Sequence, residues 1–276
     1  MTTRPRFRST SLLAGTAMVA LLLVAALASY VWAPAAAFDI DVPHKLEAPS
    51  AAHWLGTDSL GRDVVALLVV GSRVSIAVGL IAVGIGIGFG VALGLLAAVK
   101  RGWIEEAVMR AADFGFAFPA LLSAIMLTAI YGPGLVTSIV AIGIFNVPVF
   151  IRITRASALM VRSREFVTAA RALGKGEWQI TFEHVLPNIL PMLIVQATIQ
   201  FALAILAEAA LSYLGLGTQP PMPSWGRMLN DAQLQLFRAP LLAVWPGIAI
   251  AFTVLGLNLL GDGLRDRFDP RLQRRS

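Results

Sequence analysis

Few side chains in this sequence could carry out covalent or metal chemistry. The 276 residues include no cysteine, and the three histidines, His44, His53 and His184, lie far apart. Disulfides, thiol catalysis and Cys- or His-rich metal sites are therefore not expected. The phosphate-binding pattern G-x-x-x-x-G-K-[ST] is also absent from the sequence. We accordingly predict no catalytic residue, no metal site and no bound cofactor in this chain.

The charged segment 159–187 instead has the pattern of a short helix that packs against another surface. Four apolar residues recur at the spacing i, i+3, i+4 and i+7, as on one helical face: Phe166, Ala169, Ala170 and Leu173. Glu165 lies near the expected N-terminus and Arg171 near the C-terminus, where the helix dipole favours each charge. Gly174 is suited to ending the helix, and Pro187, after Leu186, suits the first turn of the next one.

A helix of about ten residues is marginal in water unless its apolar stripe is covered. The cover could be the membrane surface or the rest of the same chain. It could equally be a groove in another protein, which is a common way of recognising an amphipathic helix. The residue pattern by itself leaves both possibilities open.

A second group of candidate residues is polar and lies elsewhere in the chain. Glu208 falls in an apolar stretch, and an ionisable residue inside a membrane span is a functional candidate by default. The simpler interpretation, which we favour, is a helix-end hydrogen bond that stabilises the following loop. Asp58 and Arg62 have the spacing of an ion pair if their segment is helical, and Asp63 follows them. These three residues have either an assembly role or a purely local one.

All of these residues must be positioned by an unusually apolar chain. Hydrophobic residues make up 57% of it and charged residues only 14%, and the mean hydropathy is +0.76. Soluble domains are about 25% charged, and a spanning helix needs about 20 mostly apolar residues. Six stretches qualify, at roughly 11–33, 74–99, 112–131, 135–158, 188–213 and 241–262. We therefore predict an all-α integral membrane protein with about six transmembrane helices.

The predicted spans divide the chain into an N-terminus with the first helix (1–33), an external segment (34–73), a core (74–262) that includes the loop 159–187, and a basic tail (263–276). If the N-terminus is cytoplasmic, 17 of the 22 Lys and Arg residues fall on the cytoplasmic side and five outside. This bias predicts that both termini are cytoplasmic. It also explains the net charge of +6 without nucleic acid as a partner.

Two features of the predicted spans concern packing. Gly84, Gly86, Gly88, Gly90 and Gly94 form small-xxx-small pairs, which favour close approach of helices over ligand binding. The run 146–148 (NVP) introduces a proline into the fourth span, where it permits a kink. That kink is either a hinge, a bend lining a pathway, or a static packing feature.

Four separated motifs together resemble one family. The run from Ala169-Ala170 through Gly174 to Leu186-Pro187 is similar to the EAA loop of permease subunits of ABC importers. The runs 53–63 (HWLGTDSLGRD), 208–217 (EAALSYLGLG) and 223–226 (PSWG) are similar to segments of C-type permeases of dipeptide, oligopeptide and nickel importers. The resemblance covers residues 50–270 approximately. The chain departs from it at Thr168, where the loop's name calls for Glu, and at Lys175-Gly176, where small residues are usual.

The resemblance implies an ABC importer type I permease fold in a bacterial cytoplasmic (inner) membrane. Residues 165–174 would then be a coupling helix, with Phe166, Ala169, Ala170 and Leu173 as its contact face. The implied partners are a second homologous permease in a heterodimer, two ATPase subunits that hold ATP and Mg²⁺, and an extracytoplasmic substrate-binding protein. Glu208 and Trp225, with Asp58, Arg62 and Asp63, would belong to an external gate or assembly region.

The activity implied is ATP-driven uptake of peptides by alternating access, with no covalent chemistry in this chain. Nickel or another small solute is the alternative within the family. An ion-coupled secondary carrier is the alternative from another class of transporter. Such a carrier needs a coupling-ion site near the membrane midplane, and the predicted spans offer no paired charges there.

Overall fold

The computed structural model describes residues 7–32 and 37–268 of the chain. Its regular structure in these ranges is helical, apart from one isolated bridge between Thr57 and Asp63. The longer helices are α1 (Phe7–Ala28), α3 (Val64–Lys100), α4 (Trp103–Ala117), α5 (Ala120–Tyr131), α6 (Leu135–Arg162), α9 (Leu186–Tyr213) and α11 (Leu241–Phe268). The shorter ones are η1 (Val42–His44), α7 (Glu165–Ala172), α8 (Glu177–Ile180), η2 (Thr181–Val185), α10 (Trp225–Ala232) and η3 (Gln233–Gln235). The predicted all-α fold class is confirmed.

Five helical segments of the described chain are long and apolar enough to cross a membrane. They are α1, α3, α6, α11 and the continuous helix Glu177–Tyr213, which joins α8, η2 and α9. The helices α4 and α5 meet at a bend of 83° and make a sixth crossing if they count as one broken span. About six transmembrane helices were expected, and the structure agrees.

Helix α3 begins ten residues earlier than the expected span 74–99, inside the segment that we expected to be external. Asp63 starts it as the N-cap, because its Oδ1 accepts a hydrogen bond from the N–H of Ala66 at 2.8 Å. Arg73 marked the boundary in the sequence, but the helix continues through it. The guanidinium of Arg73 donates to Ser29 Oγ and lies 3.7 Å from the centroid of the Tyr30 ring, both beyond the end of α1. Its charge therefore has local partners, and the helix has no reason to end there.

The expected third span, 112–131, is two helices rather than one. Helix α4 begins at Trp103 and ends at Ala117, and α5 begins at Ala120. The cause is Pro119, which lacks an N–H and disfavours helical geometry in the residue before it. Phe118 is accordingly extended, with φ −104° and ψ 134°.

Helices α3 and α6 pack closely together, and their contact depends on three glycines. A Cβ atom on Gly86 would lie 2.6 Å from the Cβ of Asn146, and one on Gly90 would lie 2.5 Å from the Cβ of Phe150. Gly94 meets Thr154 in the same way. Gly84 and Gly88 have open space instead. The predicted role of glycine in close packing is confirmed for one stripe of α3, while the other stripe is exposed.

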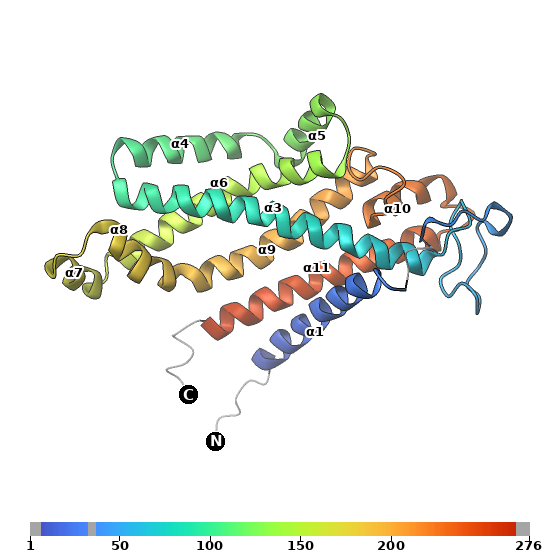
Figure 1. The fold of residues 1–276 in the computed structure, drawn as a ribbon, viewed down its shortest axis with the longest axis horizontal. Coiled ribbons are helices and arrows are strands. Elements are labelled where there is room, and N and C mark those ends of the chain that lie inside the picture. Colours follow the sequence, from blue (N-terminus) through green and yellow to red (C-terminus); the bar gives the residue numbers. More distant parts are fainter. Residues whose placement is uncertain (1–6, 33–36, 269–276) are drawn as a thin grey trace, which may run out of the picture.

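The remaining helices are arranged around this pair (Figure 1). Helix α9 packs against α3 and α6, and α1 lies beside α11 at the edge of the bundle. Gly256 and Gly263 of α11 allow this second close contact, since a Cβ on either would meet Met18 or Leu12 of α1 at 2.8 Å or less. Helices α7 and α8 lie at one end of the bundle and α10 at the opposite end. We call these the α7 end and the α10 end.

The glycine contact predicts a position-specific effect of added side chains. Gly90→Val should lower the thermal midpoint of the purified chain in detergent, because overpacking costs about 1–3 kcal/mol and α6 cannot move without disturbing the core. Gly88→Val, two residues away on the open side, is the control and should leave the midpoint nearly unchanged. Equal midpoints for the two variants would contradict the α3–α6 packing.

Candidate functional site

Helix α7 projects from one end of the bundle as a separate short element (Figure 1). It runs from Glu165, in its first turn, to Ala172, with Arg171 in its last turn. Leu173 follows as the C-cap, and its N–H donates to Ala169 O at 3.1 Å. Gly174 has φ +83°, a conformation that side chains with a Cβ rarely adopt, and its N–H donates to Arg171 O at 2.9 Å. The expected short helix ended by glycine is therefore present.

The apolar residues of α7 are divided between two faces, which the expected single stripe did not predict. Val167 and Ala170 are buried and pack in a cluster with residues of α3, α6 and the helix Glu177–Tyr213. Phe166 remains 46% exposed and Leu173 82% exposed, and Ala169 is exposed as well. Ala170 therefore does not share the exposed face of Phe166 and Leu173, because its methyl group is already covered by this chain.

Val167 is the residue that the sequence reasoning missed on this helix. Its spacing to Ala170, i and i+3, was visible, but it competed with the wider set that began at Phe166. The outer face of α7, by which we mean Phe166, Ala169 and Leu173, is the part left open to a partner. The inner face, Val167 and Ala170, fixes the helix to the bundle.

An ion-pair network reinforces this attachment. Glu177, the first residue of α8, accepts from Arg171 Nε at 2.7 Å and also pairs with Arg162, the last residue of α6. Arg162 further donates to Thr181 Oγ1 at 3.2 Å, and its side chain is largely buried. One carboxylate therefore connects three elements: α6, α7 and α8. The sequence reasoning placed Arg171 at the helix end but did not identify Glu177 as its partner.

Leu186 and Pro187 begin α9, where the chain leaves this region. Leu186 is half-buried beside the cluster that covers Val167, and Pro187 lies in the first turn of α9. The helix itself already begins at Glu177, inside the segment expected to be a loop, so Pro187 does not start it. The preceding turn, Thr181–Val185, is a π-helix, which is a frequent feature at functional sites. His184 in that turn lies with its ring 6.3 Å from the ring of Phe166, in an edge-on orientation. The turn therefore supports the outer face of α7 from one side.

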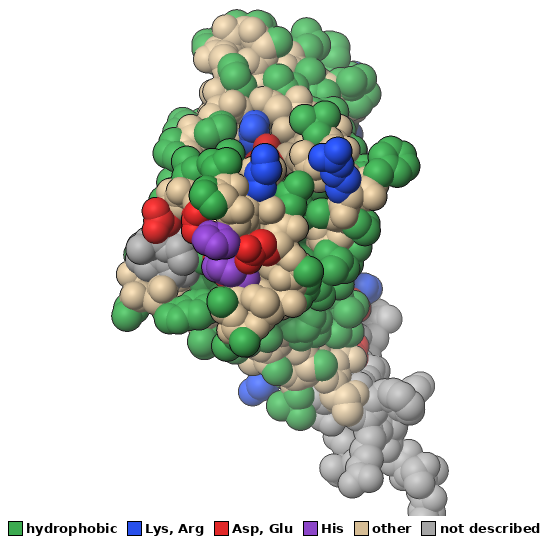
Figure 2. All heavy atoms as spheres, turned by 90° about the vertical axis from the view of Figure 1, so that its right-hand side faces the viewer, with side chains coloured by type: hydrophobic (Ala, Val, Ile, Leu, Met, Phe, Trp, Pro, Cys, Tyr) green, Lys and Arg blue, Asp and Glu red, His purple; other side chains and the backbone are tan. Residues whose placement is uncertain are grey.

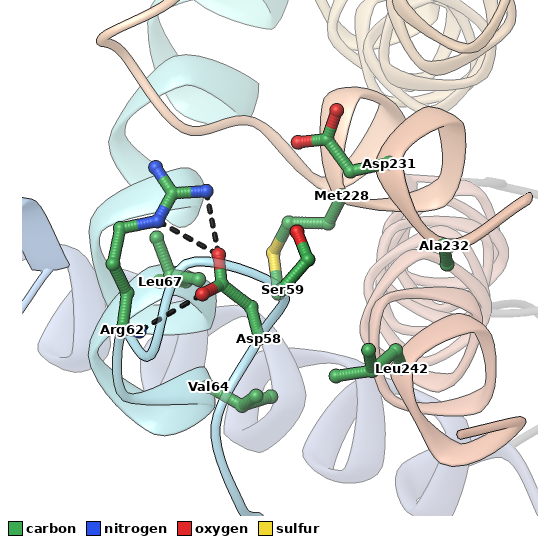
Figure 3. A pocket seen from close by; sticks show the side chains of 9 residues that line it. All are labelled: Asp58, Ser59, Arg62, Val64, Leu67, Met228, Asp231, Ala232 and Leu242. Carbon is green, nitrogen blue, oxygen red and sulfur yellow. Dashed lines mark hydrogen bonds and ion pairs between the residues drawn. The ribbon is translucent and has the colours of Figure 1, made fainter. Parts of the chain in front are cut away.

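The candidates Asp58, Arg62 and Asp63 are far from α7, at the α10 end. Asp58 and Arg62 do form an ion pair, with Arg62 Nε donating to Asp58 Oδ2 at 2.7 Å, but in a turn rather than a helix (Figure 3). The other oxygen of Asp58 accepts from the backbone N–H groups of Leu60 and Arg62 at 2.8 and 2.9 Å. Asp63 caps α3 and also contacts His53 Nδ1 at 2.9 Å. These carboxylates thus shape the turn that leads into α3.

Trp225 connects this turn with α10. Its indole Nε1–H donates to the carbonyl of Leu68 at 2.9 Å. Its ring packs directly on Gly71, since a Cβ atom added to Gly71 would lie only 2.9 Å from Trp225 Cδ1. Trp225 and Met228 pack with the buried first turns of α3. A cavity of about 20 Å³ separates Asp58 and Arg62 from Met228 and Asp231 of α10 (Figure 3). The cavity is the size of a water molecule and does not suit a solute.

Glu208 is fully buried near the end of α9 and is held by hydroxyl groups. Its Oε1 accepts from Ser212 Oγ at 2.5 Å and from Thr218 Oγ1 at 2.9 Å. Ser212 Oγ in turn accepts from the N–H of Thr218 at 2.8 Å. This geometry supports the simpler interpretation, in which Glu208 stabilises the loop after α9. Gly226 brings α10 against the same place, since a Cβ there would lie 2.6 Å from Ala209 Cα.

The outer surface of the α10 end carries acidic and histidine side chains close together, with Lys and Arg side chains elsewhere on the same face (Figure 2). Among them, His44 Nδ1 lies 2.7 Å from Asp41 Oδ2, and this hydrogen bond holds the pKa of His44 above its usual value of 6.5. Within residues 7–32 and 37–268 there is no group of three or more His, Asp or Glu side chains arranged to hold a metal ion. The acidic groups that we describe here are engaged in capping and pairing.

The burial of Glu208 predicts a large effect on stability. Glu208→Ala should lower the thermal midpoint of the chain in detergent, because Ser212 and Thr218 lose a buried acceptor, at a cost of about 1–3 kcal/mol for each unsatisfied donor. Glu208→Gln keeps an acceptor oxygen and should lose less. Glu106→Ala, at an exposed position on α4, is the control and should leave the midpoint unchanged. A midpoint for Glu208→Ala as high as that of the control would rule out a structural role for the carboxylate.

Comparison with known proteins places these features in a family. Residues 90–274 match the family model described as the binding-protein-dependent transport system inner membrane component. The glutathione transport system permease protein GsiD of Pectobacterium atrosepticum is 42% identical over 260 residues, which is 94% of this chain and 86% of the relative. The dipeptide transport system permease protein DppC of Alkalihalophilus pseudofirmus is 45% identical over 83% of this chain and 76% of its own length.

The fold has solved counterparts as well. A chain of the MetNI methionine ABC transporter, in an inward-facing conformation, superposes with a TM-score of 0.61 over 74% of this chain and 96% of its own length, at 20% identity. That identity supports the fold alone, which is the importer type I permease fold expected from the sequence. The sequence relatives also support membership in a family, because the GsiD relative is 42% identical over 94% of this chain. The chain belongs to the family of binding-protein-dependent transport system inner membrane components, and it is a multi-pass permease of the inner membrane.

Proposed function

We propose that this chain is one of two permease subunits of an ATP-driven importer of short peptides. Membership in the family implies that the permease works with an ATPase and a substrate-binding protein. The relatives named for glutathione and dipeptides support peptides as the solute, in preference to nickel. The second permease would be a homologue, so that the two chains form a heterodimer with the solute pathway between them.

The observation that carries the proposal is the outer face of α7. A helix of eight residues is too short to persist alone in water, yet this one leaves Phe166 and Leu173 exposed while Val167 and Ala170 attach it to the bundle. Such an arrangement suits a partner groove that accepts an apolar helix face. We infer that the partner is the ATPase subunit and that ATP and Mg²⁺ are bound there.

The attachment of α7 supports a mechanical role. Glu177 joins α7 to the end of α6 and to the start of the helix Glu177–Tyr213, so a displacement of α7 is passed to two spanning helices. Closure of the ATPase dimer would move α7, and the two helices would open the pathway to one side or the other. This is alternating access with the energy supplied outside the membrane.

Charge distribution supports an orientation. The α7 end carries the arginine-rich loop 159–187, and α1 begins and α11 ends on the same side of the bundle (Figure 1). By the positive-inside rule we place the α7 end and both termini in the cytoplasm. The α10 end then faces outward, where its acidic and histidine-bearing surface would receive the substrate-binding protein (Figure 2).

A pull-down of the tagged complex in mild detergent tests the docking surface. Phe166→Asp should remove the ATPase subunit from the complex, because a charge on the outer face cannot be buried in an apolar groove without a large cost. Phe237→Asp, at a fully exposed phenylalanine near the α10 end, is the control and should retain the ATPase. ATP-dependent peptide uptake should fall by at least tenfold in the Phe166→Asp variant.

Two results would argue against the importer. One is a native chain that purifies without any ATPase subunit under several conditions. The other is peptide uptake that follows an ion gradient and does not need ATP. Either result would favour the ion-coupled carrier.

The exit from α7 gives an independent prediction. Gly174→Val should reduce uptake strongly while leaving membrane insertion intact, because φ +83° costs a residue with a Cβ about 1–2 kcal/mol and would alter the course of the chain after α7. Gly176→Val is a matched control, since Gly176 has φ −69° and equally open surroundings. Uptake by cells expressing each variant, normalised to the amount in the membrane, is the measurement. Normal uptake by Gly174→Val would show that the geometry of this turn is unimportant for coupling.

A further inference from the structure

We propose that the break between α4 and α5, with the adjacent face of α6, forms a water-facing wall of the solute pathway. Asp113 and Arg152 would place one charge of each sign on that wall. This inference rests on the proposed function, because it assigns the pathway of that importer to particular residues.

The break lies near the middle of the bundle. Gly115, three residues before Phe118, packs on Pro148 of α6, because a Cβ on Gly115 would lie 2.6 Å from Pro148 Cγ. Pro148 is the fourteenth of the 28 residues of α6. The helices run antiparallel, since Glu105 pairs with Arg155 and Asp113 with Arg152. The chain therefore turns by 83° at a depth where the neighbouring spanning helix is at its midpoint.

Irregular backbone at this depth is not compatible with contact to lipid. The last four carbonyl groups of α4 and the first three N–H groups of α5 have no partners within their helices, since the N-cap Pro119 has no N–H. Hydrocarbon cannot supply such partners, so exposed irregular backbone occurs in membranes only where it is buried in protein or lines water. Residues 116–122 are all exposed in this chain. The wall must therefore face either a second chain or water.

The charges beside the break favour water. Asp113 and Arg152 pair at 2.6 Å, yet their side chains remain 47% and 48% exposed. Arg152 lies four residues after Pro148, on the part of α6 that leads from the break toward the α7 end. A half-exposed ion pair at that position would be costly against lipid tails. It would be equally costly against an apolar partner surface, whereas water solvates it.

A track of charge leads from this pair toward the α7 end. Glu106, Arg110 and Asp113 are spaced at i, i+4 and i+7 and so share one face of α4. Glu106 and Arg110 form a pair at 3.5 Å, and both are well exposed. The charges make this face of α4 unsuited to contact with lipid tails. It is consistent with a wet passage from the break to the cytoplasmic side.

The two charge signs on one wall suit a solute that carries both. A peptide with free ends has an ammonium and a carboxylate, and it can exchange places with the Asp113–Arg152 pair without leaving either side chain unpaired. Arg152 would form charge-assisted hydrogen bonds to the carboxylate, and Asp113 would accept them from the ammonium. The ring of Phe116, 4.3 Å from the Arg152 guanidinium, holds the arginine against this wall.

The absence of cysteine from the chain permits a direct test. Phe118→Cys places a thiol at the break, at a side chain that is 50% exposed, and Leu21→Cys places one on the apolar face of α1, at a side chain that is 58% exposed. Each variant is assembled with its partner subunits and treated with membrane-impermeant thiosulfonates, without nucleotide and with ATP trapped. The thiol of the Phe118→Cys variant should react at least tenfold faster than that of the Leu21→Cys variant in one of the two states.

The charges are tested in the Phe118→Cys background. Adding Asp113→Asn should raise the reaction rate of the introduced thiol with an anionic thiosulfonate relative to a cationic one by several-fold, because Arg152 is left without its counter-charge. Adding Arg152→Gln should shift the ratio in the opposite direction. A ratio that does not change in either variant would overturn the placement of this pair on the wall.

Failure of this inference can be told apart from failure of the importer. If the complex takes up peptide with ATP but the Phe118→Cys thiol reacts no faster than the Leu21→Cys thiol in both states, the pathway does not pass this wall and the inference is wrong. If the Phe118→Cys thiol reacts rapidly but the native complex shows no ATP-dependent uptake, the wall is wet and the proposed function is wrong.

Discussion

The close contact between α3 and α6 is the constraint on which the other functional features depend. Gly86, Gly90 and Gly94 allow the two helices to touch through backbone, so their relative position has little freedom. Pro148, in the middle of α6, then packs on Gly115 of α4. Arg162, at the end of α6, pairs with Glu177, which also binds α7. The start of α3 supplies the surface for Trp225 and α10. One contact thereby relates the position of α7, the broken span α4–α5 and the α10 end.

The two ends of the bundle use their side chains differently. At the α10 end, Asp58, Asp63, Trp225 and Glu208 each satisfy local groups, and together they hold the turn before α3, α10 and the loop after α9 as one unit. At the α7 end, the chain itself covers only the inner face of α7 and leaves the outer face exposed. A surface that is firmly attached yet incompletely covered is what a transmitting contact requires, because it must be rigid toward its own chain and complementary to another.

Two charged side chains in or beside the predicted spans have local structural partners in the folded chain. Glu208 is an ionisable residue in an apolar helix, but two hydroxyl groups and a loop close over it. Arg73 marked the end of a predicted span, but Ser29 and Tyr30 receive its guanidinium and α3 passes through. The pair Asp113–Arg152 is the contrary case, because it remains half-exposed beside irregular backbone. The exposed fraction of the side chain, rather than its charge alone, distinguishes Glu208 from the Asp113–Arg152 pair.

The sequence by itself determined the class of the protein and the end of its short helix α7. Lipid imposes long apolar helices whatever their neighbours are, so the spans could be found from composition, and Gly174 acts through its own backbone. The break at Pro119 is also a local effect, but the expected span 112–131 ran through it. Only the tertiary structure decided which side of α7 is open. Phe166, Val167, Ala169 and Ala170 are apolar neighbours on a short helix, and periodicity shows that faces exist but not which one the bundle covers. It likewise decided that one glycine stripe of α3 is packed and the other free, because that depends on where α6 lies, and no local pattern of residues contains that information.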